Sequence, residues 1–566
     1  MGGADLVTIG DGVECKVRAI LQVVDESEGP CTKKEYHLTM VPVGSSLWGQ
    51  VVDHLGRALS KTGDLLRGEP QGACQQLGTE AWLPLLNRQP DMGSREQITE
   101  ALITGVKALD ILTPLGRGQA LQVSGPKGSG KTQLCLDAIL GQQGTGVRCV
   151  YAAVGCTGDQ LSRTVAQLEE HKAMEYTTVV AAPSDRSLGE QYAAMLTACS
   201  IAEAIRDAGG HALVVLNDVG VAVRMWEMIT VAMADLGSVA LDVLPASEQV
   251  GQQVDMGKKE GEGGGEEEGM VEYEGMLISV AVAQRRRFFS SMIQRCAKMH
   301  RRLRGGSLTG LFVVPGCPAG SGELTDEMTA KRVESMKQKV RSYRHLTEKQ
   351  KKKLLHALEK PASASDSGAV KEKETQMNDI RASQELRTEI VEEFMSIVDG
   401  QIVLKRPSGV GVEERHAGVI VDPRASLSRI GSRAHPPALV DLAPSIRFDL
   451  LQAEDARKFA AAAIQSDDRY KRTIHRADIL KAALQQPKRS LCPLEIQVVH
   501  LMAIKTGLLD NCEPSQVEER LDRITSMIQN SSVQSVLEEI AKTKRLTATS
   551  QATLEAALAD FIRTSL

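Results

Sequence analysis

Hydrophobic and polar positions form three successive patterns along the chain, and each pattern predicts a different kind of structure. Over residues 1–60, apolar and polar residues alternate between glycines, which is typical of short, half-buried β-strands. Over residues 97–447, continuous apolar runs alternate with stretches of helical period, and over residues 448–566 the period is helical, with breaks at Pro487 and Pro493. The chain is therefore predicted to be multidomain, with a small N-terminal β-barrel, a central α/β domain and a C-terminal α-helical bundle.

The central segment contains apolar runs that predict the strands of a parallel sheet. These runs are Ala120–Ser124, Arg148–Val154, Tyr176–Val180 and Ala212–Leu216. Strands that alternate with helices along a chain usually pair in parallel. Residues 61–96 are rich in Gly, Pro and Gln and are predicted to be a linker between the first two domains.

Two segments are predicted to interrupt the central domain as insertions. Residues 257–275 are acidic and of low complexity, so they cannot bury a core and are expected to form a disordered loop. Residues 329–383 begin with a lysine-rich helical pattern and continue into a Ser- and Ala-rich stretch. This second insertion is either a basic arm for nucleic acid or acidic partners, or a solvated helix and linker. The second interpretation is favoured, because Tyr343 is the one aromatic side chain there that could stack on a base.

Composition and charge exclude several classes of function. The chain has 566 residues, which is too long for a single core. Its formal net charge of -5 gives no general attraction to nucleic acid or to anionic membranes, and no apolar run approaches the roughly 18 residues that a membrane span needs. We expect a soluble or peripherally bound protein without a nucleic-acid partner. The eleven cysteines show no CxxC spacing and are expected to be reduced thiols, and no targeting peptide is visible at the acidic N-terminus.

The clearest chemical motif is GPKGSGKT, which follows one apolar run and precedes an amphipathic one. A strand, a glycine-rich loop and a helix in this order form a phosphate-binding loop, in which backbone N–H groups cradle anionic oxygens. A glycine-rich turn that matches by chance is the alternative, and the strand and helix on either side argue against it. The expected phosphate ligands are Gly125, Pro126, Lys127, Gly128, Ser129, Gly130, Lys131 and Thr132.

Three further positions bear on whether the site could turn over a bound nucleotide. The run Ala212–Leu216 ends in Asn217-Asp218, so either Asp218 assists a magnesium ion with Thr132, or Asn217 occupies that point and the carboxylate is lost. Cys156 follows a neighbouring strand, where hydrolysis would need a carboxylate, and a thiol of ordinary pKa does not replace one. Arg429 lies in Ser426-Leu-Ser-Arg-Ile-Gly431 and is either a surface residue or an arginine that reaches a neighbouring subunit's phosphates.

These motifs, taken with others along the chain, resemble the α subunit of F-type ATP synthases. The series comprises Gly10-Asp-Gly12, VPVGSSLWGQVVDHLGRAL from Val41, TGVKALDILTPLGRGQ from Thr104, GPKGSGKT, AMEYTTVV from Ala173, GGSLTG from Gly305, DGQIVL from Asp399, SLSRIGS from Ser426 and LEIQVVHLMAIKTGLLD from Leu494. The resemblance covers nearly the whole chain in order. It implies that the central domain is RecA-like and binds nucleotide.

The resemblance also implies a function, partners and a location. The α subunit binds ATP or ADP with Mg²⁺ without turning it over, alternates with catalytic β-type subunits in a hexamer, and lends an arginine, here Arg429, to its neighbour's catalytic site. Gln485 and Gln486 fall near the glutamines that face the adenine. Rotor and stalk subunits are further expected partners, and the implied location is the matrix face of the mitochondrial inner membrane, peripherally bound, with the plastid thylakoid as the alternative.

The sequence departs from the family pattern at points that keep other functions open. Asn217 stands where the family has a magnesium-linked aspartate, the N-terminal barrel is shortened, and the arginine- and proline-rich loop around the rotor, expected between Thr230 and Val250, is absent. A structural paralogue that acts as a scaffold in another assembly is therefore the second hypothesis. A ring translocase acting on a polymer is the third, and Asn217, Cys156 and the acidic net charge argue against it.

Overall fold

A computed structural model of the chain describes most of the three predicted regions. The described residues are 5–6, 21–24, 35–59, 81–235, 270–273, 276–314, 393–405, 418–462, 468–510, 512–529 and 533–565. All of them belong to one compact unit, Met1–Pro315 with Glu393–Leu566. The predicted insertion at 329–383 lies outside the described residues.

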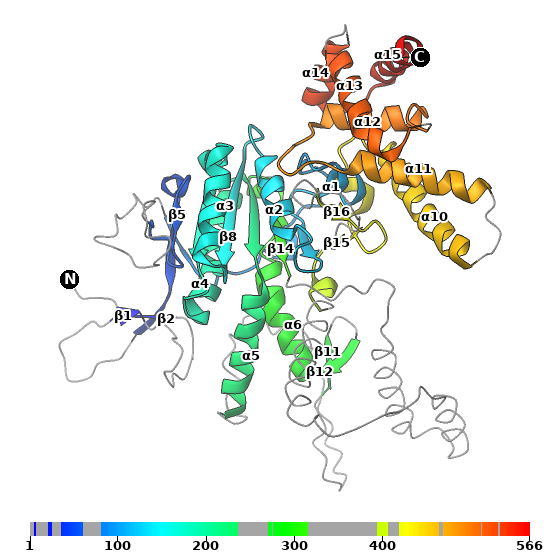
Figure 1. The fold of residues 1–566 in the computed structure, drawn as a ribbon. Coiled ribbons are helices and arrows are strands. Elements are labelled where there is room, and N and C mark those ends of the chain that lie inside the picture. Colours follow the sequence, from blue (N-terminus) through cyan, green and yellow to red (C-terminus); the bar gives the residue numbers. More distant parts are fainter. Residues whose placement is uncertain are drawn as a thin grey trace, which may run out of the picture. The chain divides into compact units, whose positions relative to one another are not determined.

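The centre of this unit is a mainly parallel β-sheet (Figure 1). Among the described residues its strand order is β16-β15-β7-β14-β10-β8-β9-β5. In addition, β13 pairs with β14 and β17 pairs with β15. Neighbouring strands from β15 to β5 are parallel, which confirms the predicted parallel α/β fold. The bounds of the strands are β5 Val51–Val52, β7 Ala120–Ser124, β8 Val147–Val154, β9 Thr177–Ala182, β10 His211–Asn217, β13 Ala297–Lys298, β14 Ser307–Val313, β15 Gly400–Lys405, β16 Ile420–Val421 and β17 Leu427–Ser428.

Both faces of the sheet are buried, because its strands are apolar on both sides. Leu213 and Val215 of β10 belong to the main hydrophobic cluster, which includes side chains of α2 and α3. Val214 and Leu216, which alternate with them, are equally buried, and α4 contacts β8, β9, β10 and β14. Continuous apolar strands of this kind are expected where helices cover both faces. The helices of this region are α1 Lys107–Leu112, α2 Lys131–Leu140, α3 Gly158–Glu170, α4 Leu188–Asp207, α5 Gly220–Asp235 and α6 Val280–Ile293.

The N-terminal strands contribute partly to the central sheet. β1 (Asp5–Leu6), β2 (Leu21–Val24) and β3 (Glu35–Leu38) form an antiparallel sheet, while β5 joins the central sheet beside β9. The predicted linker at residues 61–96 contains β6 (Ala81–Pro84), which pairs with β4 (Met40–Val43). The linker prediction is therefore wrong over this strand, because the pairing partner lies about forty residues away and local composition does not reveal it.

The acidic insertion is also more ordered than predicted at its C-terminal end. Within residues 257–275, β11 (Met270–Tyr273) pairs antiparallel with β12 (Met276–Ser279). The expectation of a disordered loop is thus wrong for Met270–Tyr273. The glycines and glutamates that dominate the segment hide a short run containing Val271 and Tyr273, residue types that favour strands. Residues 257–269 lie outside the described ones.

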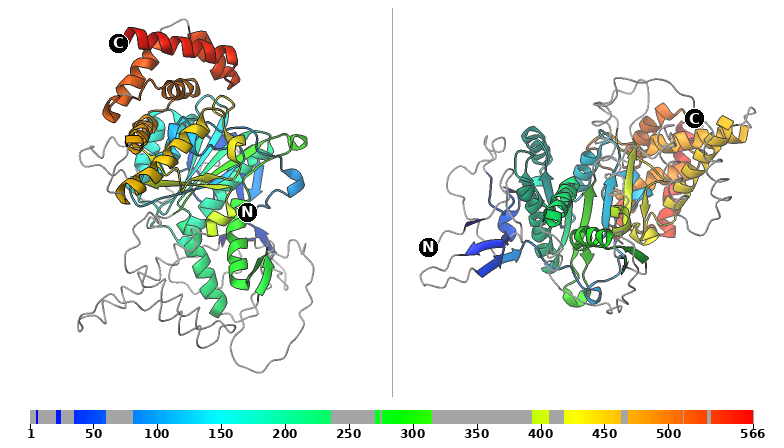
Figure 2. Two further views of the ribbon diagram at one scale, coloured as in Figure 1. Left: turned by 90° about the vertical axis from the view of Figure 1, so that its right-hand side faces the viewer. Right: turned by 90° about the horizontal axis from the view of Figure 1, so that it is seen from below.

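The C-terminal region is helical, as predicted, and begins at Ala443 instead of Phe448. Pro487 and Pro493 both fall between α11 and α12, and Pro493 directly precedes α12. Figure 2 shows α12 to α15, in orange and red, packed together. The bounds of these helices are α10 Ala443–Ala462, α11 Asp468–Leu484, α12 Leu494–Lys505, α13 Val517–Gln529, α14 Gln534–Thr543 and α15 Ala548–Ser565.

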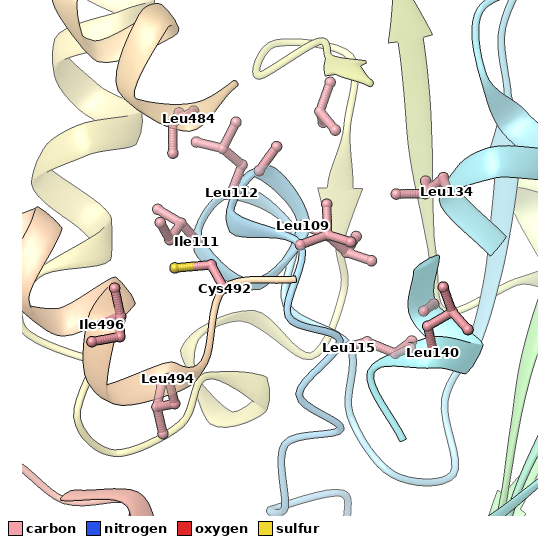
Figure 3. Close-up of a cluster of buried hydrophobic side chains, with 14 of the residues drawn as sticks. Leu109, Ile111, Leu112, Leu115, Leu134, Leu140, Leu484, Cys492, Leu494 and Ile496 are labelled. Atoms are coloured by element: carbon pink, nitrogen blue, oxygen red, sulfur yellow. The ribbon is translucent and has the colours of Figure 1, made fainter. Parts of the chain in front are cut away.

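Helix α1 joins the α/β region to the C-terminal helices through apolar packing. Leu109, Ile111 and Leu112 of α1 lie between α2, which contributes Leu134 and Leu140, and the segment around α11 and α12, which contributes Leu484, Cys492, Leu494 and Ile496 (Figure 3). The buried carboxylate of Asp110 reinforces this joint, because it accepts hydrogen bonds from Thr104 and from Gln497 Nε2 at 2.9 Å. Helix α12 is therefore tied to α1 through this bond. No helix in the described part of the chain is long and apolar enough to cross a membrane.

Candidate functional site

The GPKGSGKT loop connects β7 to α2, as the sequence predicts. Gly125 has φ 148°, and a Cβ there would lie 2.7 Å from the carbonyl oxygen of Leu404 on β15. Gly130 has φ 91° and caps the N-terminus of α2 in the left-handed region. These two positions require glycine, so the loop is held close to the sheet edge with the start of α2 behind it. A helix N-terminus preceded by such a loop presents N–H groups to an anion.

Lys131 is the cation of this loop. Its Nζ donates hydrogen bonds to the carbonyl oxygens of Gly125 at 2.7 Å and Pro126 at 3.3 Å, so the ammonium group lies over the loop. Burial lowers the pKa of Lys131, and the nearby negative charge of Asp218 acts in the opposite direction. A desolvated ammonium group held over a ring of N–H donors is well suited to the oxygens of a phosphate chain.

Asn217 faces the loop from the end of β10. Its Nδ2 donates to Thr132 Oγ1 at 3.1 Å and to Tyr151 OH at 2.7 Å. The amide thus takes the position from which a carboxylate would support a metal bound at Thr132. The next residue, Asp218, accepts a hydrogen bond from the N–H of Gly220 at 3.0 Å, at the start of α5. Negative charge is therefore present near the loop, but one residue beyond the contact with Thr132.

Cys156 lies just after β8, where a water-orienting base would be needed. Its thiol is half-buried, and burial raises its pKa to about 11, with further contributions from Asp218 and Asp185. The thiol is therefore neutral at physiological pH and cannot accept a proton as a general base.

Arg429 lies at the opposite end of the sheet from the phosphate loop. It follows β17, which pairs with the first residue of β15 through Gly400 and Ser428, whereas the loop leaves the far end of β7. At about 3.3 Å per residue, these levels are separated by roughly 13 Å along the strands. The guanidinium donates to the carbonyl oxygens of Met395 at 2.7 Å and Ser396 at 3.0 Å and is exposed. Arg429 therefore lies away from the phosphate loop of its own chain.

Gln485 and Gln486 lie in the segment between α11 and α12. The side chain of Gln486 is bonded to its own chain, since Oε1 accepts from Lys107 N at 2.8 Å and Nε2 donates to the carbonyl oxygens of Gly105 and Ser490. Gln485 is exposed. Gln486 therefore connects the segment after α11 to the backbone around the start of α1, a contact that its sequence position did not suggest.

Asp137 is the residue near the site that sequence reasoning missed. It lies on α2, accepts a hydrogen bond from Gln133 Nε2 at 2.7 Å, and lines a cleft together with Gln486 and Val419. Burial raises its pKa to about 6, against the effects of Gln133 and Arg489. A carboxylate inside the apolar run Leu134-Cys-Leu-Asp-Ala-Ile-Leu140 was the available signal, because buried carboxylates usually have a specific partner.

Comparison with known proteins identifies two family domains in the order that the fold suggests. Residues 105–236 match the nucleotide-binding domain of the ATP synthase alpha/beta family. Residues 437–561 match the C-terminal domain of the ATP synthase alpha/beta chain. The two matches contain the phosphate loop, β8, β10, the helices from α10 to α14 and most of α15.

Several ATP synthase alpha subunits are similar to the chain over most of its length. The protein from Acidothermus cellulolyticus is 27% identical over 572 residues, which covers 98% of this chain and 81% of the relative. The one from Mycobacterium marinum is 28% identical and covers 92% of this chain and 74% of the relative, and the one from Lawsonia intracellularis is 26% identical with 92% and 79% covered. The chain therefore contains a nucleotide-binding domain and a C-terminal domain that match the ATP synthase alpha/beta family, and it is similar to ATP synthase alpha subunits over most of its length.

Proposed function

We propose that the chain is a non-catalytic, nucleotide-binding α-type subunit of a proton-translocating F-type ATP synthase. The observation that carries this proposal is the contrast between its intact phosphate loop and the neutral thiol of Cys156 at the end of β8. The loop retains the groups that hold a phosphate chain. At the position where hydrolysis would need a general base, however, Cys156 offers no proton acceptor. Binding without turnover follows from this combination.

The ligand of the proposed site is ATP or ADP with Mg²⁺. The backbone of Gly125 to Gly130 and the Lys131 ammonium group would hold the phosphates, and Thr132 would offer its hydroxyl oxygen to the metal. Asn217 already donates a hydrogen bond to that oxygen, so the remaining lone pair is the one available. Asp218 would contribute its negative charge from the next position. Bound magnesium would neutralise part of the negative charge of the phosphates, and Thr132 and Lys131 would position the metal and the phosphates respectively.

Arg429 is proposed to act on a neighbouring catalytic subunit. Its exposure and its separation from the chain's own loop support action across an interface. An arginine supplied in this way stabilises the charge of the phosphoryl transition state and contributes about 10³-fold or more to the rate. The partners in this proposal are catalytic β-type subunits in an alternating hexamer, with rotor and stalk subunits beyond them, and the mitochondrial location remains a prediction.

A matched pair of variants tests this role of Arg429. In the complex isolated with the chain, Arg429→Ala should lower ATP hydrolysis about 10³-fold and leave nucleotide binding to this chain's own loop unchanged. Arg433→Ala removes an exposed arginine four residues further on and should leave hydrolysis unchanged. Equal rates for the two variants would contradict the proposal.

The scaffold hypothesis is supported by a different observation. Asn217 has an amide where a carboxylate would support the metal. Such a replacement is expected in a chain that is no longer under selection to bind nucleotide. A chain that assembles with a different set of proteins, and whose complex is unaffected by Lys131→Ala, would favour the scaffold over the α-type subunit.

A further inference from the structure

Tyr151 lies in the interior of the sheet, next to the residue that faces the phosphate loop. It belongs to β8, which runs parallel to β10, and it is paired there with Val215. Asn217 is two residues further along β10, which is about 6.6 Å along the strand. Side chains two residues apart share a face of a strand. The Tyr151 ring therefore lies on the same side of the sheet as the Asn217 side chain and extends along the strands to reach it.

The Tyr151 hydroxyl group is held from two sides. Its oxygen accepts a hydrogen bond from Asn217 Nδ2 at 2.7 Å, and a second hydrogen bond joins it to the side chain of Thr164 on α3. The residue is 2% exposed, and burial raises the pKa of the phenol, so the hydroxyl group stays protonated. Because its oxygen accepts from Asn217, its single hydrogen serves the bond to Thr164.

This arrangement determines which end of the Asn217 amide faces the phosphate loop. An amide nitrogen carries two hydrogens, and Nδ2 of Asn217 uses one on Tyr151 and the other on Thr132 Oγ1, which lies at 3.1 Å. If the amide turned over, its oxygen would meet the phenol oxygen, whose hydrogen is already used. The phenol thus holds the amide N–H toward Thr132, and the Thr132 oxygen keeps one lone pair for a metal ion.

The same contacts connect four elements around the loop. Thr132 is in the first turn of α2, Asn217 ends β10, Tyr151 lies in β8 and Thr164 lies in α3. Residues that orient a metal ligand from behind matter for affinity, since their loss typically costs about 10-fold to 100-fold in metal binding. Asn217 is such a partner of Thr132, and Tyr151 acts one step behind Asn217.

We propose that Tyr151 is a positioning residue for magnesium at Thr132 and that it acts through the Asn217 amide. The inference rests on the proposed function, because it concerns the metal that accompanies the nucleotide at this loop. The backbone of the loop and Lys131 would hold the phosphates independently of Tyr151. Loss of the phenol hydroxyl should therefore affect the magnesium-dependent part of nucleotide binding and spare the rest.

The test compares ADP binding with and without magnesium. Dissociation constants of the full chain for ADP are measured by titration calorimetry in excess Mg²⁺ and in EDTA, for the parent and for Tyr151→Phe, which removes only the hydroxyl group. Tyr151→Phe should weaken ADP binding about tenfold in Mg²⁺ and by less than about threefold in EDTA. Equal weakening in the two solutions would show a general structural role and would overturn the inference.

Tyr176→Phe is the matched control, since it also removes a phenol hydroxyl group next to α2. The Tyr176 hydroxyl donates to the carbonyl oxygens of Ile139 and Leu140, both at 3.3 Å, at the C-terminal end of that helix. This variant should leave both ADP constants unchanged. A loss in Mg²⁺ as large as that of Tyr151→Phe would contradict the proposal, because any hydroxyl lost near α2 would then act alike.

A double-mutant cycle shows whether Tyr151 acts through Asn217. Asn217→Ala should weaken ADP binding in Mg²⁺ about tenfold. Adding Tyr151→Phe should weaken it no further, because the phenol has then lost the group that it positions. Effects that multiply would refute the inference and leave the proposed nucleotide site standing. A parent chain that binds ADP in neither solution would overturn the proposed site itself, and the inference with it.

Discussion

Removing the carboxylate of Glu203 should destabilise the α/β region more than most single substitutions. Glu203 on α4 is completely buried and accepts hydrogen bonds from Arg295 Nε at 2.8 Å, Arg295 Nη2 at 2.6 Å and Asn87 Nδ2 at 3.0 Å. Burial lowers the pKa of Arg295. The negative charge and the hydrogen bonds of Glu203 outweigh this effect, so that the pKa is raised above its ordinary value. The pair therefore joins α4, the segment after α6 and the segment after β6.

Glu203→Ala leaves the guanidinium of Arg295 buried with only neutral acceptors, Ser200 Oγ at 2.9 Å and the Leu85 carbonyl oxygen at 3.3 Å. Breaking a buried ion pair from one side costs about 3 to 5 kcal/mol. For a domain of this size, that corresponds to a fall in melting temperature on the order of 10 °C. Because a multidomain chain need not unfold in one step, the quantity to follow is the calorimetric transition of this region.

A double variant separates the charge effect from the loss of packing. Glu203→Leu with Arg295→Met replaces the pair by apolar side chains, and such replacements are often neutral or stabilising. The double variant should therefore recover most of the lost melting temperature. A Glu203→Ala protein that melts within about 2 °C of the parent, or a double variant that melts no higher than the single one, would refute this reasoning.

Three further predictions concern the site. Lys131→Ala should weaken polyphosphate binding about tenfold to a hundredfold, because it removes a charged hydrogen-bond donor, and a change below threefold in equilibrium dialysis would contradict the role of the loop. Asn217→Asp should strengthen magnesium-dependent binding by about tenfold to a hundredfold, since it restores a carboxylate beside Thr132; Asp218→Glu is the control, and an unchanged magnesium titration would count against the geometry. The pKa of Asp137, raised to about 6 in the folded chain, means that this group stabilises the fold below its unfolded pKa near 4 and that this contribution is lost as pH rises through 6. Asp137→Asn should therefore raise the melting temperature at pH 7 and not at pH 4, and equal shifts at both pH values would contradict the assignment.

Much of the α/β region could be predicted from sequence because its signals are local. The run Ala120–Ser124 matches β7 residue for residue, and the helix after the loop follows from its apolar period. The N-terminal region is harder, because β6 pairs with a strand far away in the chain and β5 adds to the edge of the central sheet. Such long-range pairings leave no periodic trace in a short strand.

In the candidate site, too, local sequence predicts some features and tertiary contacts decide the others. The motif located the phosphate loop, but the sequence left open whether Asn217 or Asp218 occupies the position beside Thr132. The fold shows that the Asn217 amide contacts Thr132. Likewise, the bonds that occupy Gln486 come from Gly105 and Lys107, nearly four hundred residues earlier in the chain. Tertiary partners of this kind decide whether a polar side chain is available to a ligand, and local sequence does not encode them.

The most direct test of the account is the composition of the complex that this chain forms in its native source. Native mass spectrometry after gentle isolation through a tag on this chain would give the partners and their copy numbers. The proposed function predicts catalytic β-type subunits in equal copy number with this chain, together with rotor subunits, and nucleotide that remains bound to this chain. A stable complex that lacks catalytic β-type subunits would contradict it.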